Sequence, residues 1–266
     1  MELIRLTPWD LAIAASLILA LAALSWQLRL GVGKRLLISA TRTLVQLMLL
    51  GLVLHLIFDQ SNPLFIGGLL LIMALIAARE IRARQTRPFG GLWGYGIGGS
   101  TMFVSAFALM LLATQVIIQV DPWYNPQYLI PLFGMLLGNT MSGIAIALDG
   151  LTRSAWRQRP VIEGRLLLGE TWQQAIGDIR QEALRSGLIP IINQMSIAGL
   201  VSLPGMMTGQ ILAGSPPLEA AKYQILILLL VAAGTGFGTM GAMWLASRRL
   251  FDERQRLRLD RLKSTS

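Results

Sequence analysis

The chain of 266 residues is 54% hydrophobic and only 14% charged, and it contains no cysteine. The absence of cysteine excludes disulfides, zinc–thiolate sites and thiol catalysis. The formal net charge of +9 suits either nucleic acid or a membrane surface, and the distribution of the charges along the chain decides between the two.

Seven stretches predict membrane-spanning helices, because about 20 apolar residues cross the ~30 Å hydrocarbon layer of a bilayer. They are Leu11–Leu28, Leu36–Phe58, Leu64–Ala78, Ile97–Val120, Tyr128–Leu148, Leu188–Leu212 and Tyr223–Ala246. The third is short, and the Asn62-Pro63 pair predicts that its helix begins at Pro63. A secretory signal peptide is the alternative for the first stretch, but its stronger positive cluster follows the apolar residues instead of preceding them.

The basic residues are unevenly divided between the two sides that these spans define. If the connections alternate between sides, 21 of the 23 Lys and Arg fall on one side and only Arg5 and Lys222 on the other. The 21 are Arg29, Lys34, Arg35, Arg42, Arg79, Arg82, Arg84, Arg87, Arg153, Arg157, Arg159, Arg165, Arg180, Arg185 and the seven from Arg248 to Lys263. Such a bias marks the cytoplasmic side, which predicts the N-terminus outside, the C-terminus inside and a basic cytoplasmic tail at about 247–266. Nucleic-acid binding is disfavoured, because the charges follow helix ends rather than one ordered face.

One inside connection, at about 152–187, is much longer than the others. Four of its residues recur at the spacing of one helix face, namely Trp172, Ala175, Ile176 and Ile179. This spacing predicts an amphipathic helix on the cytoplasmic side. Such a helix lies on the lipid surface or docks into another protein, and the pattern alone leaves both possibilities open.

The segment EGRLLLG, from Glu163 to Gly169, resembles the first half of the EAA loop of ABC importer permeases. The short helix of that loop fits a groove on the ATPase subunit. Glu163 and Gly169 match the EAA pattern in type and spacing, whereas Gly164 and Arg165 replace its two alanines. The resemblance implies that this connection couples the chain to an ATPase.

The sixth apolar stretch contains a helix breaker in the segment VSLPGMMTGQILAG, from Val201 to Gly214. Pro204 has no N–H to donate, so we expect the helix to kink or unwind there, with Gly205 and Gly209 tolerating the resulting backbone. In lipid the freed carbonyls must face protein or water, which predicts that the following side chains line a cavity. These side chains are Met206, Met207, Thr208 and Gln210. A kink packed against a neighbouring helix is the alternative.

Seven spans, a long inside connection after the fifth, and the LPGMMTGQILAG segment together resemble the Fet-type iron-export permease family of bacterial ABC transporters, which also includes plant proteins linked to aluminium tolerance. The resemblance covers roughly Ala12 to Arg249. It implies a multi-pass permease of the bacterial inner membrane that pairs as a homodimer with two copies of a separate cytoplasmic ABC ATPase. Family members are associated with iron export in bacteria and with a nucleotide-sugar in plants, so the substrate stays open.

The chain carries no phosphate-binding loop of its own. Its sole Gly-Lys pair, Gly33-Lys34, is followed by Arg35 and lacks the glycine that the P-loop pattern requires five residues earlier. We therefore expect no enzyme activity, no catalytic residue and no cofactor bound by this chain, with ATP and magnesium held by the partner subunit.

Neutral polar side chains predicted at mid-depth form a candidate substrate pathway together with the residues after Pro204. They are Gln46, Asn139, Thr140, Asn193 and Gln194. Polar groups at this depth must face the bundle or a wet cavity, although ordinary interhelical hydrogen bonds would also satisfy them. No Asp or Glu is predicted at mid-membrane to bind a bare hard cation, so the metal ligands stay unknown, and a chelated metal or a polar conjugate fits this lining as well.

The sequence thus predicts an all-α polytopic membrane protein with seven transmembrane helices, forming a single permease domain over residues 1–266. We expect it to move a small solute with ATP hydrolysed by a separate subunit, and the resemblance adds iron and the export direction. The expected ATPase contacts are Glu163, Gly169, Trp172, Ala175, Ile176 and Ile179. The alternative is a secondary transporter or a non-transporting scaffold, but a secondary transporter should show a mid-membrane carboxylate or an inverted repeat, and neither is found.

Overall fold

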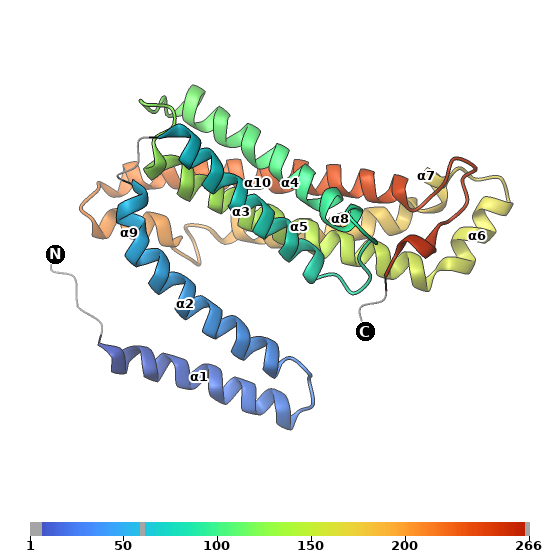
Figure 1. Cartoon of the computed structure of the whole chain (residues 1–266), viewed down its shortest axis with the longest axis horizontal. Helices are drawn as coiled ribbons and strands as arrows, with labels where there is room; N and C mark the ends of the chain where they lie inside the picture. The colour runs from blue at the N-terminus through green and yellow to red at the C-terminus, as the bar shows by residue number, and fades with distance from the viewer. Residues whose placement is uncertain (1–6, 59–61, 264–266) are drawn as a thin grey trace. The chain divides into compact units, whose positions relative to one another are not determined.

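The computed structural model describes residues 7–58 and 62–263, and these residues are mainly helical (Figure 1). They contain isolated β-bridges but no β-strand. The chain divides into two compact units, Met1–Gln60 and Ser61–Ser266. Six helical segments of the described chain are long and apolar enough to cross a membrane. The prediction of an all-helical, multi-pass membrane protein is confirmed.

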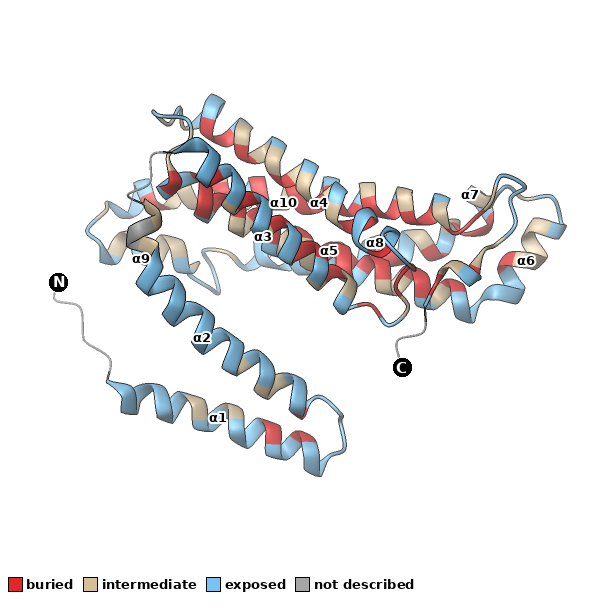
Figure 2. Cartoon of the chain, in the orientation of Figure 1, coloured by how far each residue is buried: buried red, intermediate tan, exposed pale blue. Residues whose placement is uncertain are grey.

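The first unit is a hairpin of two apolar helices, α1 (Pro8–Gln27) and α2 (Gly33–Phe58). The connecting turn places Gly31 at a φ of 71°, a backbone conformation that glycine adopts without strain. A Cβ on Gly33 would lie 2.9 Å from the ring nitrogen of Trp26, so the close approach at the start of α2 requires glycine. Most other described side chains of this unit are exposed (Figure 2), as expected of helices that face lipid.

The second unit is a helix bundle centred on α5 (Pro126–Arg157) and α10 (Pro217–Arg249). Both pack against α4 (Trp93–Leu111) and α8 (Gly177–Ile197), and α3 (Pro63–Ala83) packs on α4 and α5. Buried residues gather where these helices pack against one another (Figure 2), and α5 contributes several fully buried side chains to the core. These are Phe133, Leu136, Ile144, Leu148 and Leu151.

An asparagine-proline pair starts both α3 and α5. Asn62 Oδ1 accepts a hydrogen bond from the Leu64 N–H at 2.9 Å, and Asn125 Oδ1 accepts one from the Gln127 N–H at 3.0 Å. The proline after each asparagine lies in the first turn, where no backbone donor is needed. The prediction that the third span begins at Pro63 is confirmed.

The sixth predicted span is two helices instead of one. α8 ends at Ile197, residues 198–204 are not helical, and α9 (Gly205–Leu212) begins with Pro204 as its N-cap. The fourth predicted span is α4 continued by a π-helical turn, η1 (Leu112–Ile117). The six candidate spans are therefore α1, α2, α3, α4 with η1, α5 and α10, and the α8–α9 pair occupies the remaining predicted stretch.

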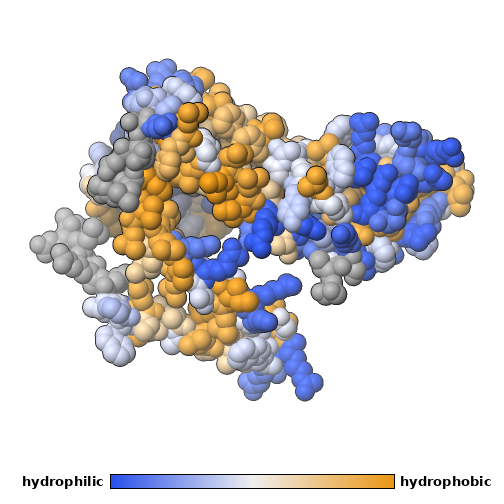
Figure 3. All heavy atoms as spheres, viewed as in Figure 1, coloured by the Kyte–Doolittle hydropathy of each residue, from blue (hydrophilic) through white to orange (hydrophobic). Residues whose placement is uncertain are grey.

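The long connection between α5 and α8 folds into two short helices, α6 (Arg159–Leu167) and α7 (Trp172–Ala175). The expected single amphipathic helix is wrong, because α7 ends at Ala175 and the chain turns at Ile176 before α8. The tail after α10 is folded as far as Lys263 and contains a 3-10 turn, η2 (Leu259–Arg261), while residues 264–266 lie outside the described chain. In this unit hydrophilic residues gather around α6 and α7, whereas hydrophobic residues predominate farther along the bundle (Figure 3).

Candidate functional site at the arginine-rich end of the bundle

Segments far apart in the sequence meet at the end of the second unit where α10 ends. The ring of Trp172 at the start of α7 lies 5.8 Å from the ring of Phe251 just after α10. The Trp172 backbone N–H donates a hydrogen bond of 2.9 Å to Gln255 Oε1 in the tail. Phe251 is buried, so the tail and the long connection form one folded cap.

Helix α6 ends in an exposed apolar tip. The C-terminal turn is closed by two backbone hydrogen bonds, from Gly169 to the Leu166 carbonyl and from Glu170 to the Arg165 carbonyl, each 3.1 Å. Gly169 has a φ of 92°, the left-handed conformation that this type of helix end requires and that glycine adopts most easily. Just before it, the side chains of Leu167 and Leu168 are 88% and 87% exposed. Such a pair is unusual on a polar surface and fits a contact with another molecule.

The predicted docking face on α7 and α8 is instead used within the chain. Ala175, Ile176 and Ile179 are buried, and Trp172 is half-buried against the tail. The surfaces of Ala175, Ile176 and Ile179 are therefore covered within the chain, whereas Trp172 stays partly exposed. The assignment of these residues as ATPase contacts stays a prediction. Of the predicted coupling residues, the structure leaves Glu163 half-buried and Gly169 exposed, both on α6 or its end.

The tail begins with a tight turn organised by Asp252. Its Oδ1 accepts hydrogen bonds from the backbone N–H groups of Arg254 and Arg256, at 3.0 and 2.9 Å, and its Oδ2 pairs with the Arg256 guanidinium at 2.8 Å. The backbone bond from Arg256, together with its charged side chain, holds the pKa of Asp252 below its ordinary value. Farther along, the hydrogen bond and charge of Arg258 lower the pKa of Asp260 to about 2. Both carboxylates are therefore charged at neutral pH.

The tail also forms backbone hydrogen bonds with the loop between α3 and α4. The Gly90 N–H donates to the Arg261 carbonyl at 2.8 Å, and the Lys263 N–H donates to the Pro88 carbonyl at 2.9 Å. Arg261 Nη1 in turn donates to the carbonyls of Arg249 and Phe251 at the end of α10. A cation at this position satisfies carbonyl groups that the helix leaves unpaired.

A groove of about 800 Å³ lies between the α6 tip and the tail turn. Glu163 and Glu170 supply carboxylates to the α6 side, whereas Arg254 and Arg256 lie on the tail side next to Glu253. Glu163 is paired with Arg159 at 2.8 Å, which fixes its position one turn into α6. The groove combines charges of both signs with the exposed side chain of Leu167, as expected of a docking site for a protein segment.

The predicted pathway residues are placed at several different positions. Asn139 donates to the Met135 carbonyl of its own helix at 3.0 Å, and Thr140 beside it is fully buried. Asn193 and Gln194 are exposed on α8. On α9 the predicted residues are half-buried and comprise Met206, Met207, Thr208 and Gln210. Gln46 is exposed on α2 in the first unit. Their assignment as one pathway stays a prediction.

The structure adds a cluster of buried hydroxyls that sequence reasoning missed. The side-chain oxygens of Thr140, Thr235 and Thr239 are buried, and none has a hydrogen-bond partner among the described residues. A Cβ on Gly238 would lie 2.5 Å from Thr140 Cγ2, so α5 and α10 approach closely at this point. Thr235 and Thr239 are four residues apart on α10, a spacing that places both on one helix face. Within the described residues no three His, Cys, Asp or Glu side chains form a group able to hold a metal ion.

Comparisons with known proteins cover most of the chain. The model of the uncharacterised protein family UPF0014 matches residues 8–251. The chain is 43% identical over 243 residues to the UPF0014 membrane protein slr1647 of Synechocystis, covering 90% of this chain and 91% of the relative. It is 33% identical over 225 residues to Protein ALUMINUM SENSITIVE 3 of Arabidopsis thaliana (84% and 80%), and 28% identical over 264 residues to the probable iron export permease protein FetB of Escherichia coli (97% and 98%). No solved structure matches the chain.

Proposed function

Because the chain belongs to the UPF0014 family of membrane proteins, we propose that it is the permease subunit of an ABC transporter, driven by ATP that a separate subunit hydrolyses. The resemblance to the Fet-type permeases is confirmed by the family match and by the bacterial and plant relatives. Two copies of the chain pair with two ATPase subunits, which hold ATP and magnesium.

The proposed topology has seven crossings, with the α8–α9 pair as the sixth. The arginine-rich end of the second unit then lies in the cytoplasm, where the positive-inside rule puts clusters of Lys and Arg. The N-terminus lies outside, and the folded tail after α10 lies inside. This orientation presents the α6 tip to a cytoplasmic ATPase.

The observation that carries the proposal is the exposed Leu167–Leu168 tip beside a groove of mixed charge. Buried apolar anchors surrounded by polar contacts supply most of the energy of protein interfaces. The buried α7 face stiffens the same cap, so a force on the α6 tip reaches α5 and α8 directly through the connection. We propose that the ATPase binds α6 at this tip and thereby moves α5 and α8.

The proposed substrate is an iron complex or another small polar conjugate, moved outward. The iron and the export direction come from the name of the Escherichia coli relative. The chemistry of the bundle favours a ligand whose charge is already screened, since the predicted pathway residues are amides, hydroxyls and thioethers. The half-buried α9 side chains and the buried threonines near Thr140 are the candidates to contact it.

The test removes the apolar anchor and leaves the cap intact. Leu167→Asp/Leu168→Asp should reduce recovery of the ABC ATPase that co-purifies with the wild-type chain at least about tenfold, because apolar hot-spot residues each contribute about 2 kcal/mol or more. The matched control is Gln173→Asp/Gln181→Asp, which adds the same charges at two exposed positions, one on α7 and one on α8. Recovery with the control should stay within about twofold of wild type.

Each failure has its own meaning. If the leucine variant retains the ATPase and its stimulated hydrolysis, α6 is not the docking element. If the wild-type chain in its native membrane recovers no ABC ATPase at all, the chain is not an ABC permease, and a secondary transporter or a scaffold takes its place.

A further inference from the structure

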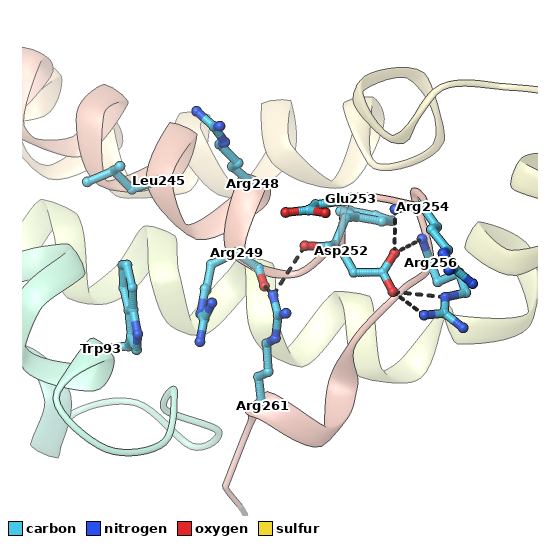
Figure 4. Close-up of a pocket in the computed structure, with 10 residues that line it drawn as sticks. Trp93, Leu245, Arg248, Arg249, Asp252, Glu253, Arg254, Arg256 and Arg261 are labelled. Carbon is cyan, nitrogen blue, oxygen red and sulfur yellow. Dashed lines mark hydrogen bonds and ion pairs between the residues drawn. The ribbon is translucent and has the colours of Figure 1, made fainter.

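A second cavity, of about 590 Å³, lies on the other side of the tail turn between the end of α10 and the start of α4 (Figure 4). Five arginines line it against two carboxylates, so its charge is positive. The arginines are Arg248, Arg249, Arg254, Arg256 and Arg261. The carboxylates are Asp252 and Glu253.

Two of these guanidinium groups already interact with other groups of the chain. Arg256 is paired with Asp252, and Arg261 donates to the carbonyls at the end of α10. The other three, of Arg248, Arg249 and Arg254, form no ion pair with the described residues. The cavity therefore holds more guanidinium groups than its own carboxylates can neutralise. Such an excess of positive charge suits the cavity to bind an anion.

Arg249 is the best-placed of the free groups. Its guanidinium lies 4.5 Å from the centre of the Trp93 ring, and its Nε atom is buried without a hydrogen-bond partner among the described residues. Arg248 lies over the Trp244 ring at 5.7 Å. A guanidinium group stacked on an aromatic ring can still donate hydrogen bonds from its edge to an anion. Tryptophan also concentrates at the depth of lipid headgroups.

An apolar groove of about 420 Å³ continues from the cavity along α4 and α10. It shares Trp93 and Leu245 with the cavity and is otherwise lined by Leu92, Gly96, Ile97 and Ser100. A Cβ on Gly96 would meet no atom within 4 Å, so the missing side chain leaves open space in the groove. Ser100 lies seven residues after Trp93, about 10 Å into a helix that is itself a candidate membrane span.

We propose that this cavity and groove bind one anionic phospholipid, with the phosphodiester among the arginines and one acyl chain along Gly96 and Leu245. A soluble phosphate would use the cavity but not the groove. An acidic protein segment would have to follow the groove past the helix ends into the bilayer, where its backbone polar groups would be unsatisfied. A phospholipid matches both parts at once, as basic pockets between membrane helices do for anionic headgroups. The proposal rests on the membrane location of the chain and not on its proposed transport function.

The experiment titrates the purified full-length chain in neutral detergent with phosphatidylglycerol and follows the thermal unfolding midpoint. Phosphatidylcholine serves as the zwitterionic lipid, and glycerol phosphate and inorganic phosphate serve as soluble anions. We expect saturable stabilisation by phosphatidylglycerol that weakens with added salt, and no comparable effect of the other three at equal concentration.

Two variants test the two halves of the site separately. Arg248→Gln/Arg249→Gln removes headgroup contacts, and its control, Arg153→Gln/Arg185→Gln, removes the same charge from exposed positions between α5 and α8. Gly96→Leu fills the groove, and its control is Gly68→Leu, whose Cβ on α3 also meets no atom within 4 Å. Each test variant should raise the apparent dissociation constant for phosphatidylglycerol about tenfold, while each control stays within about twofold.

The outcomes separate the possible occupants. Equal stabilisation by inorganic phosphate, with Gly96→Leu binding phosphatidylglycerol normally, would make this a soluble-anion site and overturn the proposal. Equal losses in the test and control arginine variants would mean a diffuse surface charge effect and would also overturn it. If the arginine variant does not fold, the comparison of Gly96→Leu with Gly68→Leu still decides, because a Cβ at either position meets no atom within 4 Å.

Discussion

At the scale of single residues, glycines and threonines set how closely the central helices approach. A Cβ on Gly187 of α8 would lie 2.7 Å from the Gly143 carbonyl oxygen and 2.8 Å from the Ala147 Cβ, both on α5. Gly143 in turn faces Thr239 of α10, whose hydroxyl would lie 3.0 Å from a Cβ there. Three helices thus meet at backbone distance, and close packing of this kind is a main source of stability for helices in lipid.

Gly187→Ala should therefore destabilise the protein, although alanine is the better helix former. The added methyl meets a backbone carbonyl of α5, which cannot move aside as a flexible side chain would. We expect the free energy of unfolding to fall by about 1–3 kcal/mol in a denaturant titration in bicelles. The control Gly236→Ala, on α10, adds the same methyl where no atom lies within 4 Å, so it should leave stability unchanged or slightly raised. An equal loss in both variants would contradict this packing.

At the scale of elements, residues 198–204 interrupt the helix between α8 and α9. Gly199 has a φ of 81°, and its N–H donates to the Ser202 carbonyl at 2.9 Å, so the chain reverses locally before α9. Leu200 and Val201 within the break are 89% and 79% exposed. Backbone groups freed in a membrane need protein or water as partners, which links this break to a wet pathway in the proposed transporter.

Single cysteines at Met207 and Gln210 test that link, because the natural chain contains no cysteine. Both should react with a water-soluble thiol reagent, and their labelling should change when ATP hydrolysis by the partner is trapped. A cysteine at Met102, which is fully buried in α4, should stay unreactive. If the cysteines on α9 are as unreactive as the one at Met102 in a transport-competent protein, α9 is packed and the pathway lies elsewhere.

At the scale of the whole molecule, the number of crossings decides whether the two termini lie on the same side of the membrane. Among the residues that the structure describes, six helical segments qualify as spans by length and hydropathy. The α8–α9 pair adds a seventh crossing only if the two pieces together cross the bilayer. With seven crossings the two termini lie on opposite sides, and with six they lie on the same side. The cap reaches the cytoplasm only when α5 ends there.

A topology measurement therefore has a clear expected outcome. An N-terminal tag should be accessible from outside intact cells, whereas a tag after Ser266 should become accessible only after the membrane is opened. The reason is the bias of 21 among 23 basic residues toward one side. Protection of both tags on the same side would mean that α8 and α9 do not complete a crossing. Accessibility of the C-terminal tag alone would invert the proposed orientation.

The helices were predictable because their causes are local. Runs of apolar residues place α1 to α5 and α10, and the Asn-Pro pair at residue 62 starts α3 as expected. The break before α9 follows from Pro204, although it begins already at Ala198. These features depend on the length of each apolar run, on its hydropathy and on the missing N–H of proline. All three can be read from the sequence.

Only the tertiary structure decided which faces are covered. The periodic face around Ile176 predicts amphipathicity equally well for a docking helix and for a buried one, and the fold buries it against the rest of the cap. The arginines at and after the end of α10 predict a basic tail, and the structure shows that Asp252 organises its turn while Gln255 bonds it to α7. Periodicity and charge specify that a surface needs a partner. Which partner it finds depends on long-range contacts, and these exist only once the chain has folded.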